Sequence, residues 1–221
     1  MAYTVKEIFY TLQGEGANAG RPAVFVRFAG CNLWSGREAD RAGARCRFCD
    51  TDFLGMDGPG GGRYKAAELA DRVASAWPGS RELAGENVDP ADPGRPFVVC
   101  TGGEPLLQVD AELVAAFKDR GFEVAIETNG SIAVPPGIDW VCVSPKAGAE
   151  TIVREGDELK FVFPQSGADP ASFERWEFRH FFLQPMDGPE RVRNTELAIG
   201  YCLTHPRWRL SVQMHKVIGL P

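Results

Sequence analysis

The sequence has no apolar run that approaches the roughly 18 residues a membrane-spanning helix requires. It also lacks the apolar stretch of a signal peptide, because Lys6 and Glu7 stand close to the N-terminus. We therefore expect a cytoplasmic protein without a membrane partner.

Basic residues are also in short supply. The chain has 24 lysines and arginines against 30 aspartates and glutamates, which gives a net charge of −6. Binding of a nucleic-acid backbone requires clustered Lys and Arg, so this balance argues against a nucleic-acid partner. A local basic pocket for a small anionic substrate remains compatible with it.

Nothing in the composition indicates disorder, since 44% of the residues are hydrophobic and 24% are charged. A chain of 221 residues is within the size that one hydrophobic core can stabilise. We expect residues 1–221 to form a single domain.

Apolar segments alternate with helical patterns along the chain. Leu69 and Val73 share one face of a predicted helix, and Asp110 caps a second one that ends before Gly121. A third helix is predicted over residues 191–204. Short β-branched and aromatic runs predict strands over residues 23–28, 97–100, 123–126, 140–143, 159–163, 181–183 and 210–212. Such alternation is typical of an α/β fold with a mostly parallel sheet.

Polar segments follow five of the predicted strands. They are residues 101–105, 127–130, 144–146, 184–187 and 213–216. In parallel sheets the carboxyl ends of the strands meet at one edge, and ligands bind there. The five segments therefore predict one shared pocket.

Three of the six cysteines have the spacing of a metal centre. Cys46 and Cys49 place two thiolates within reach of one centre, and Cys31 supplies a third. Three thiolates leave one iron of a four-iron cluster free to bind a ligand, whereas structural zinc usually takes four protein ligands. A zinc site completed by His215 is the alternative. The other cysteines lie in apolar segments and are predicted to be structural: Cys100, Cys142 and Cys202.

The cysteine segment 31–49 and the Thr-Gly-Gly-Glu-Pro segment 101–105 together resemble the radical S-adenosylmethionine (SAM) superfamily. Within that superfamily, segments across nearly the whole chain resemble the 7-carboxy-7-deazaguanine synthase family. These segments are residues 12–16, 27–34, 49–51, 127–130, 143–146 and 184–187. Each motif alone is a weak signal, and their combination is specific.

The sequence departs from the usual pattern at two places. Residues 35–45 add a charged insertion to the cysteine loop, as in some members of the synthase family, and we expect it to leave the number of ligands unchanged. Met214 stands where the family pattern has threonine, so the resemblance assigns its side chain no role.

The resemblance implies a partial, open (β/α) barrel and a lyase of queuosine, or 7-deazapurine, biosynthesis. A [4Fe-4S] cluster on Cys31, Cys46 and Cys49 would cleave SAM to a 5′-deoxyadenosyl radical. That radical would abstract hydrogen from 6-carboxy-5,6,7,8-tetrahydropterin, whose ring contracts with loss of ammonia to give 7-carboxy-7-deazaguanine. The resemblance further implies Mg2+ at Thr51, a homodimer, and an electron donor such as a flavodoxin.

The resemblance also assigns the ligand contacts. The substrate contacts are Leu12, Gln13, Gly14, Glu15, Arg27, Thr101 and Pro221. The SAM contacts are Phe48, Cys49, Asp50, Gly103, Glu104, Asn129, Ser144, Pro145, Lys146, Gln184, Pro185, Met186 and Asp187. Arg27 offers two parallel hydrogen bonds to the pterin carboxylate, and Glu15 accepts hydrogen bonds from the guanidine-like edge of the ring.

Two other functions remain open. A glycyl-radical-activating SAM enzyme uses the same cluster and cofactor but must admit a polypeptide, whereas segment 12–16 together with Arg27 favours a small anionic heterocycle. A non-catalytic zinc-binding module predicts a colourless protein with four closed metal ligands.

Overall fold

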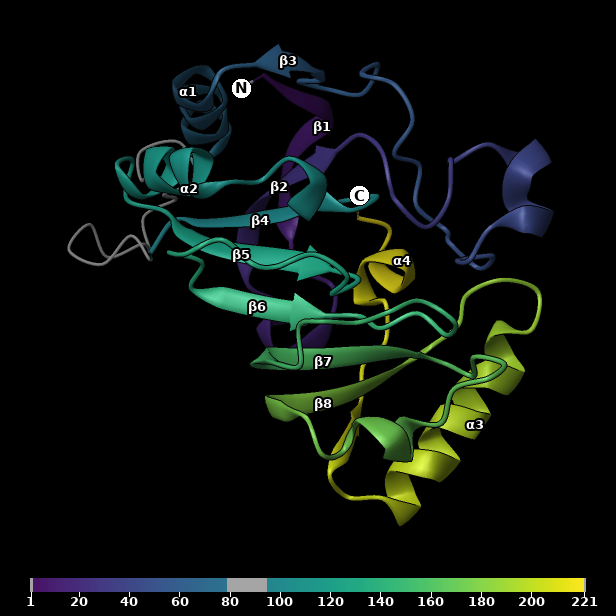
Figure 1. Ribbon diagram of the computed structural model, residues 1–221. Helices are drawn as coiled ribbons and strands as arrows, with labels where there is room; N and C mark the ends of the chain where they lie inside the picture. The colour runs from purple at the N-terminus through teal and green to yellow at the C-terminus, as the bar shows by residue number, and fades with distance from the viewer. Residues whose placement is uncertain (1, 79–94, 221) are drawn as a thin grey trace.

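The computed structural model describes residues 2–78 and 95–220, and their strands form one sheet (Figure 1). Over these residues the sheet has nine strands in the order β3-β1-β2-β4-β5-β6-β7-β8-β9. The strands are β1 (Tyr3–Leu12), β2 (Pro22–Phe28), β3 (Gly62–Tyr64), β4 (Phe97–Gly102), β5 (Glu123–Thr128), β6 (Trp140–Val143), β7 (Glu155–Phe163), β8 (Glu177–Pro185) and β9 (Trp208–Leu210). The outermost strands, β3 and β9, do not pair with each other, so the sheet is open.

The sheet is parallel from β2 to β9 and antiparallel at its β1 edge. Every neighbouring pair from β2–β4 to β8–β9 is parallel. β1 runs antiparallel to both β2 and β3. The predicted α/β class with an open, mostly parallel sheet is therefore confirmed, although the sequence pattern predicts neither β1 nor β3.

Four α-helices accompany the strands in the described part of the chain. They are α1 (Ala66–Ala76), α2 (Ala111–Lys118), α3 (Arg191–Thr204) and α4 (Met214–Ile218). α1 and α2 pack on each other and on β1 and β5, whereas α3 packs on β8 and β9 (Figure 1). No helix among the described residues is long and apolar enough to cross a bilayer.

The hydrophobic core divides between these two groups of helices. Leu69 of α1 and Leu113 of α2 are fully buried against apolar residues of β1, β2, β4 and β5. At the β8–β9 end of the sheet, Ala198 of α3 packs with Phe161, Leu183 and neighbouring residues of β7 and β8. Strands buried in this way read as continuous apolar runs, which is why the sequence pattern predicts β4 to β8.

Local sequence signals set most of the element boundaries. The Asp110 carboxylate accepts a hydrogen bond from the Leu113 amide at 3.0 Å and caps α2, as predicted. Gly121 follows that helix with a φ of 81°. The predicted last strand at 210–212 is displaced, since β9 ends at Leu210 and the Ser211 amide bonds the Leu183 carbonyl beyond it.

Candidate active site

One cavity of about 380 Å³ lies at the carboxyl edge of the parallel strands. Each of the five polar segments predicted to share a pocket contributes to its lining. The predicted site residues that line it are Leu12, Gln13, Gly14, Glu15, Arg27, Cys31, Cys46, Phe48, Cys49, Asp50, Thr51, Thr101, Gly103, Asn129, Ser144, Lys146, Gln184, Pro185 and Asp187. The predicted residues outside the lining are Glu104, Pro145 and Met186. Pro221 lies outside the described residues.

The cysteine loop forms the wall of the cavity next to β2 and β4. Cys31 lies just beyond the end of β2 at Phe28, and its sulfur accepts a hydrogen bond from the Leu33 amide at 3.4 Å. The Cys46 amide returns to the Leu33 carbonyl, which draws the two ends of the loop together. None of the three cysteines is in a disulfide, so all three thiols are available to iron.

The insertion at 35–45 stabilises this loop. It contains the 3-10 helix Glu38–Gly43, from which Arg41 reaches back to the cysteines. The Arg41 guanidinium donates to the carbonyls of Arg47 and Cys49 at 2.8 and 3.1 Å. It also stacks on the Trp34 ring at 4.1 Å. The insertion thus stabilises the cysteine loop through Arg41 and contains no additional cysteine.

The thiols of Cys46 and Cys49 interact directly. A hydrogen bond between them lowers the pKa of Cys49 to about 6 and raises that of Cys46. Burial raises the pKa of the Cys31 thiol. Among the described residues no three His, Cys, Asp or Glu side chains converge on a single-ion site, and His215 packs against Gly14 instead. Soft thiolates suit iron–sulfur clusters, so the donor set fits the predicted cluster.

Two glycines after β4 allow the backbone to approach the cysteine loop. A Cβ at Gly103 would lie 2.2 Å from the Gly30 carbonyl oxygen and 2.8 Å from the Cys31 Cβ. Gly102 has a φ of +137°, and a Cβ there would lie 2.2 Å from the Phe28 carbonyl oxygen. Only glycine fits at these positions, since both contacts are with backbone atoms.

We expect the substitution Gly103→Ala to displace Cys31 and to lower the iron content of the reconstituted protein. Overpacking against backbone should also lower the free energy of unfolding by about 1–3 kcal/mol. Iron analysis and urea unfolding measure the two effects. Gly43→Ala is the matched control, because no heavy atom lies within 4 Å of a Cβ added in that part of the loop. Unchanged iron content and stability in Gly103→Ala would contradict the prediction.

Glu104 is fully buried and lies behind the cavity wall. Its carboxylate accepts hydrogen bonds from the Thr128 hydroxyl at 2.7 Å, the Asn129 amide at 2.8 Å and the Leu106 amide at 3.0 Å. Burial raises the pKa of Glu104, although the hydrogen bonds from these donors act to lower it. The carboxylate therefore fixes the end of β5, where Asn129 lines the cavity.

Charged side chains from distant segments meet at the opposite wall. The Lys216 ammonium contacts a carboxylate oxygen of Asp50 and one of Asp187, each at 2.6 Å. The Lys146 ammonium donates to the Ser144 hydroxyl at 2.6 Å, and burial lowers the pKa of Lys146. The Lys216 contacts join the cysteine loop, the end of β8 and α4.

The C-terminal segment touches the loop after β1. The Met214 amide donates to the Gly14 carbonyl at 3.0 Å, and its side chain does not line the cavity. A Cβ at Gly14 would lie 2.2 Å from Nδ1 of His215, so the two residues are in close contact. The backbone of Met214 thus holds the loop after β1, and this contact does not depend on which side chain stands at position 214.

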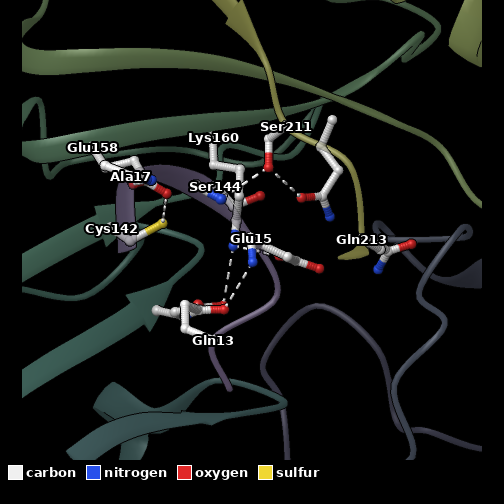
Figure 2. Close-up of polar contacts among 12 residues, drawn as sticks. Gln13, Glu15, Ala17, Cys142, Ser144, Glu158, Lys160, Ser211 and Gln213 are labelled. Atoms are coloured by element: carbon white, nitrogen blue, oxygen red, sulfur yellow. Dashed lines mark hydrogen bonds and ion pairs between the residues drawn. The ribbon is translucent and has the colours of Figure 1, made fainter. Parts of the chain in front are cut away.

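The remaining wall carries the residues predicted to bind substrate. Arg27 donates to the Glu7 carboxylate at 2.7 Å, and 21% of its side chain remains exposed. Glu15 pairs with the buried Lys160 (Figure 2). Burial alone would raise the pKa of Glu15, but the charge of Lys160 holds it below its ordinary value.

Five charged residues line the cavity without being predicted as site residues: Glu7, Asp52, Glu127, Lys160 and Lys216. Lys160 has a signal in the sequence, because it is the one charged residue in the apolar run Leu-Lys-Phe-Val-Phe at 159–163. A lysine inside a buried strand requires a partner. Glu127 and Lys216 stand within the polar segments that predict the pocket.

No protein-family model matches the chain. The 7-carboxy-7-deazaguanine synthase of Bordetella pertussis is 61% identical over 222 residues, and that of Bradyrhizobium diazoefficiens is 60% identical over 221 residues. Both alignments cover 100% of this chain and of the relative. The crystal structure of QueE from Escherichia coli superposes with a TM-score of 0.69 at 26% identity, covering 97% of this chain and 95% of that one.

Proposed function

The chain belongs to the 7-carboxy-7-deazaguanine synthase family, and on that premise we propose how the cavity serves the reaction. The reaction is the ring contraction of 6-carboxy-5,6,7,8-tetrahydropterin to 7-carboxy-7-deazaguanine with loss of ammonia, in 7-deazapurine (queuosine) biosynthesis. When bound, the iron–sulfur cluster and SAM supply the radical that starts it. The protein has to orient both ligands and exclude water.

One observation carries this proposal: three free thiols share a cavity with an arginine and a carboxylate that suit a pterin acid. Cys31, Cys46 and Cys49 would hold a [4Fe-4S] cluster and leave one iron open. Arg27 and Glu15 line the same cavity. Neither a non-catalytic zinc-binding module nor a site for a polypeptide substrate requires these thiols together with an arginine and a carboxylate.

SAM would bind between the cysteine loop and the ends of β4, β5, β6 and β8. The proposed contacts that line the cavity are Phe48, Cys49, Asp50, Gly103, Asn129, Ser144, Lys146, Gln184, Pro185 and Asp187. Glu104, Pro145 and Met186 would shape these segments from behind. In support, the Pro145 carbonyl accepts a hydrogen bond from the side-chain amide of Gln165 at 3.2 Å. The Met186 carbonyl accepts one from the side-chain amide of Asn194 at 2.9 Å.

The substrate would lie against the loop after β1 and the ends of β2 and β4. Leu12, Gln13, Gly14 and Thr101 line that side of the cavity. Arg27 would bind the pterin carboxylate with the guanidinium nitrogens that do not face Glu7. We also propose a substrate contact from Pro221.

Magnesium is proposed to bind at Thr51, which lines the cavity beside the cluster loop. Magnesium prefers hard oxygen ligands and keeps several waters, so one hydroxyl together with substrate oxygens is a suitable ligand set.

We expect Thr51→Val to raise the Mg2+ concentration for half-maximal activation by about tenfold or more, since even indirect ligand contacts change metal affinity by that factor. A magnesium titration of product formation measures it. Thr195→Val is the control, because that hydroxyl bonds only the Arg191 carbonyl within α3. An unchanged titration curve for Thr51→Val would remove Thr51 from the magnesium site.

An anaerobic assay tests the proposed function as a whole. Reconstituted protein is incubated with SAM, a strong reductant, Mg2+ and 6-carboxy-5,6,7,8-tetrahydropterin, and 7-carboxy-7-deazaguanine is followed by mass spectrometry. We expect product. Cleavage of SAM without product would overturn the substrate assignment, and failure to form a cluster under competent reconstitution would overturn the radical mechanism.

The cellular setting is part of the same proposal. We propose a single domain over residues 1–221 that works as a homodimer in the cytoplasm and receives its electron from a donor such as a flavodoxin. The proposed [4Fe-4S] cluster would be reduced by one electron at a time, and one-electron transfer is the chemistry that such donors supply.

A further inference from the structure

Lys160 of β7 lies at the floor of the cavity between two carboxylates. Its ammonium is 2.5 Å from Oε2 of Glu15 and 3.2 Å from Oε2 of Glu127. Only 5% of the lysine side chain is exposed, against 12% for Glu15 and 23% for Glu127. Lys160 is therefore the most deeply buried of the three residues, all of which line the cavity.

Gln13 closes a ring with these three residues. Its side-chain amide donates to Oε1 of Glu127 at 2.9 Å, and its side-chain carbonyl accepts from the Glu15 backbone amide at 3.1 Å. The ring thus connects the loop after β1 with β5 and β7. It fixes the direction of both carboxylates, since each is held at one oxygen by Lys160.

A pair of neighbouring carboxylates in a half-buried site is costly without a cation. Repulsion would turn one side chain away or protonate it, and either change removes a hydrogen-bond acceptor. The charge of Lys160 prevents this. Burial alone would lower the pKa of Lys160, but the charges of Glu127 and Glu15 raise it well above its ordinary value, so the lysine stays protonated.

The loop after β1 has a second anchor that does not involve Lys160. The buried Glu158 accepts from the Ala17 amide at 2.8 Å (Figure 2). The Gly16 amide donates to the Ser211 hydroxyl at 2.9 Å. Removing the lysine charge should therefore leave the loop in place. The hydrogen bonds lost with the lysine are those to the two carboxylates.

We propose that Lys160 is a positioning residue for the substrate: it holds the Glu15 and Glu127 carboxylates in place as acceptors for N–H groups of the pterin. The inference rests on the proposed function and deepens it. An aminopyrimidine edge offers adjacent N–H donors, and two fixed carboxylates match them. Lys160 acts on the substrate through these carboxylates.

Binding measurements with the SAM-loaded holoenzyme test the inference. We expect Lys160→Met to weaken 6-carboxy-5,6,7,8-tetrahydropterin binding by about 30-fold or more, as breaking a buried charge pair does. Cluster content and SAM affinity should stay unchanged. Lys160→Arg should recover most of the affinity, because it restores the charge. Lys118→Met is the control: it breaks a lysine–aspartate pair with Asp139 outside the cavity.

A double-variant cycle separates positioning from a merely structural role. If Lys160 acts through Glu15, Lys160→Met should cost less affinity in a Glu15→Gln background than in the wild type. Equal costs in both backgrounds, or equal losses of SAM and pterin binding, would overturn the inference. Should Lys160→Met fail to retain its cluster, comparison of Lys160→Arg with the wild type decides: an affinity loss as large as that of Glu15→Gln would overturn it.

Failure of the inference and failure of the proposed function give different results. If wild-type protein forms product and Lys160→Met binds the pterin as tightly as the wild type, only the role of Lys160 is wrong. If wild-type protein neither binds the pterin nor forms product, the proposed function itself is wrong.

Discussion

Replacing Cys46 with alanine is expected to abolish SAM cleavage, with 5′-deoxyadenosine below detection. Cys46 is one of the three thiols that line the cavity, and it is buried at the end of the braced loop. With two thiolates left, a four-iron cluster would have two uncoordinated irons and would be lost. Iron and sulfide analysis, visible absorbance and chromatography of the nucleoside products measure the effect.

Cys202→Ala is the matched control for that experiment. Cys202 lies on α3 outside the cavity, so its removal should leave iron content and SAM cleavage unchanged. Circular dichroism of both variants should match the wild type, since the sheet forms from other residues. Full turnover by Cys46→Ala would remove Cys46 from the cluster and would require another ligand.

Arg27→Ala is expected to weaken pterin binding by about 100-fold while leaving the cluster intact. Each hydrogen bond to a charged group contributes about 1.5–3 kcal/mol. Loss of both hydrogen bonds from the guanidinium to the pterin carboxylate therefore weakens binding by at least about 100-fold. The variant also leaves the Glu7 carboxylate, now 2.7 Å from Arg27, without its partner beside an anionic substrate. Titration of the SAM-loaded protein with the pterin measures the loss of affinity, and iron analysis shows whether the cluster is intact.

Two further variants define what Arg27 supplies. Arg27→Lys keeps the charge without the fork and should fall between the wild type and alanine. Arg179→Ala is the control, because that arginine is 76% exposed and pairs with Asp157 outside the cavity. Wild-type affinity in Arg27→Ala would place the substrate carboxylate elsewhere.

The strands in the middle of the sheet are predictable from sequence because both of their faces are buried. β1 is different: its Lys6 looks like a surface charge, yet it is buried and pairs with Asp52 and Asp57 at 2.8 and 2.7 Å. Those partners stand in a distant loop that no local pattern connects to β1. The antiparallel edge of the sheet could therefore not be derived from the chain alone.

The same reason separates the predicted from the unpredicted parts of the site. Motifs such as residues 101–105 are contiguous, so their chemistry is visible in the sequence. Lys160 and Glu15 are 145 positions apart, and their pairing exists only after β7 has joined the sheet. Short-range spacing identifies the cysteine loop in the same way, but it does not reveal that Arg41 braces it.

The contact between Gly14 and Met214 has a consequence for the order in which the protein acquires its function during synthesis. The strands from β1 to β8 emerge from the ribosome before α4, so the wall that α4 provides is added after these strands. Closing so long a loop has an entropic cost, and ligands that bind only the closed cavity offset it. A nascent chain can thus pair these strands first and bind its ligands only after α4 has closed the cavity.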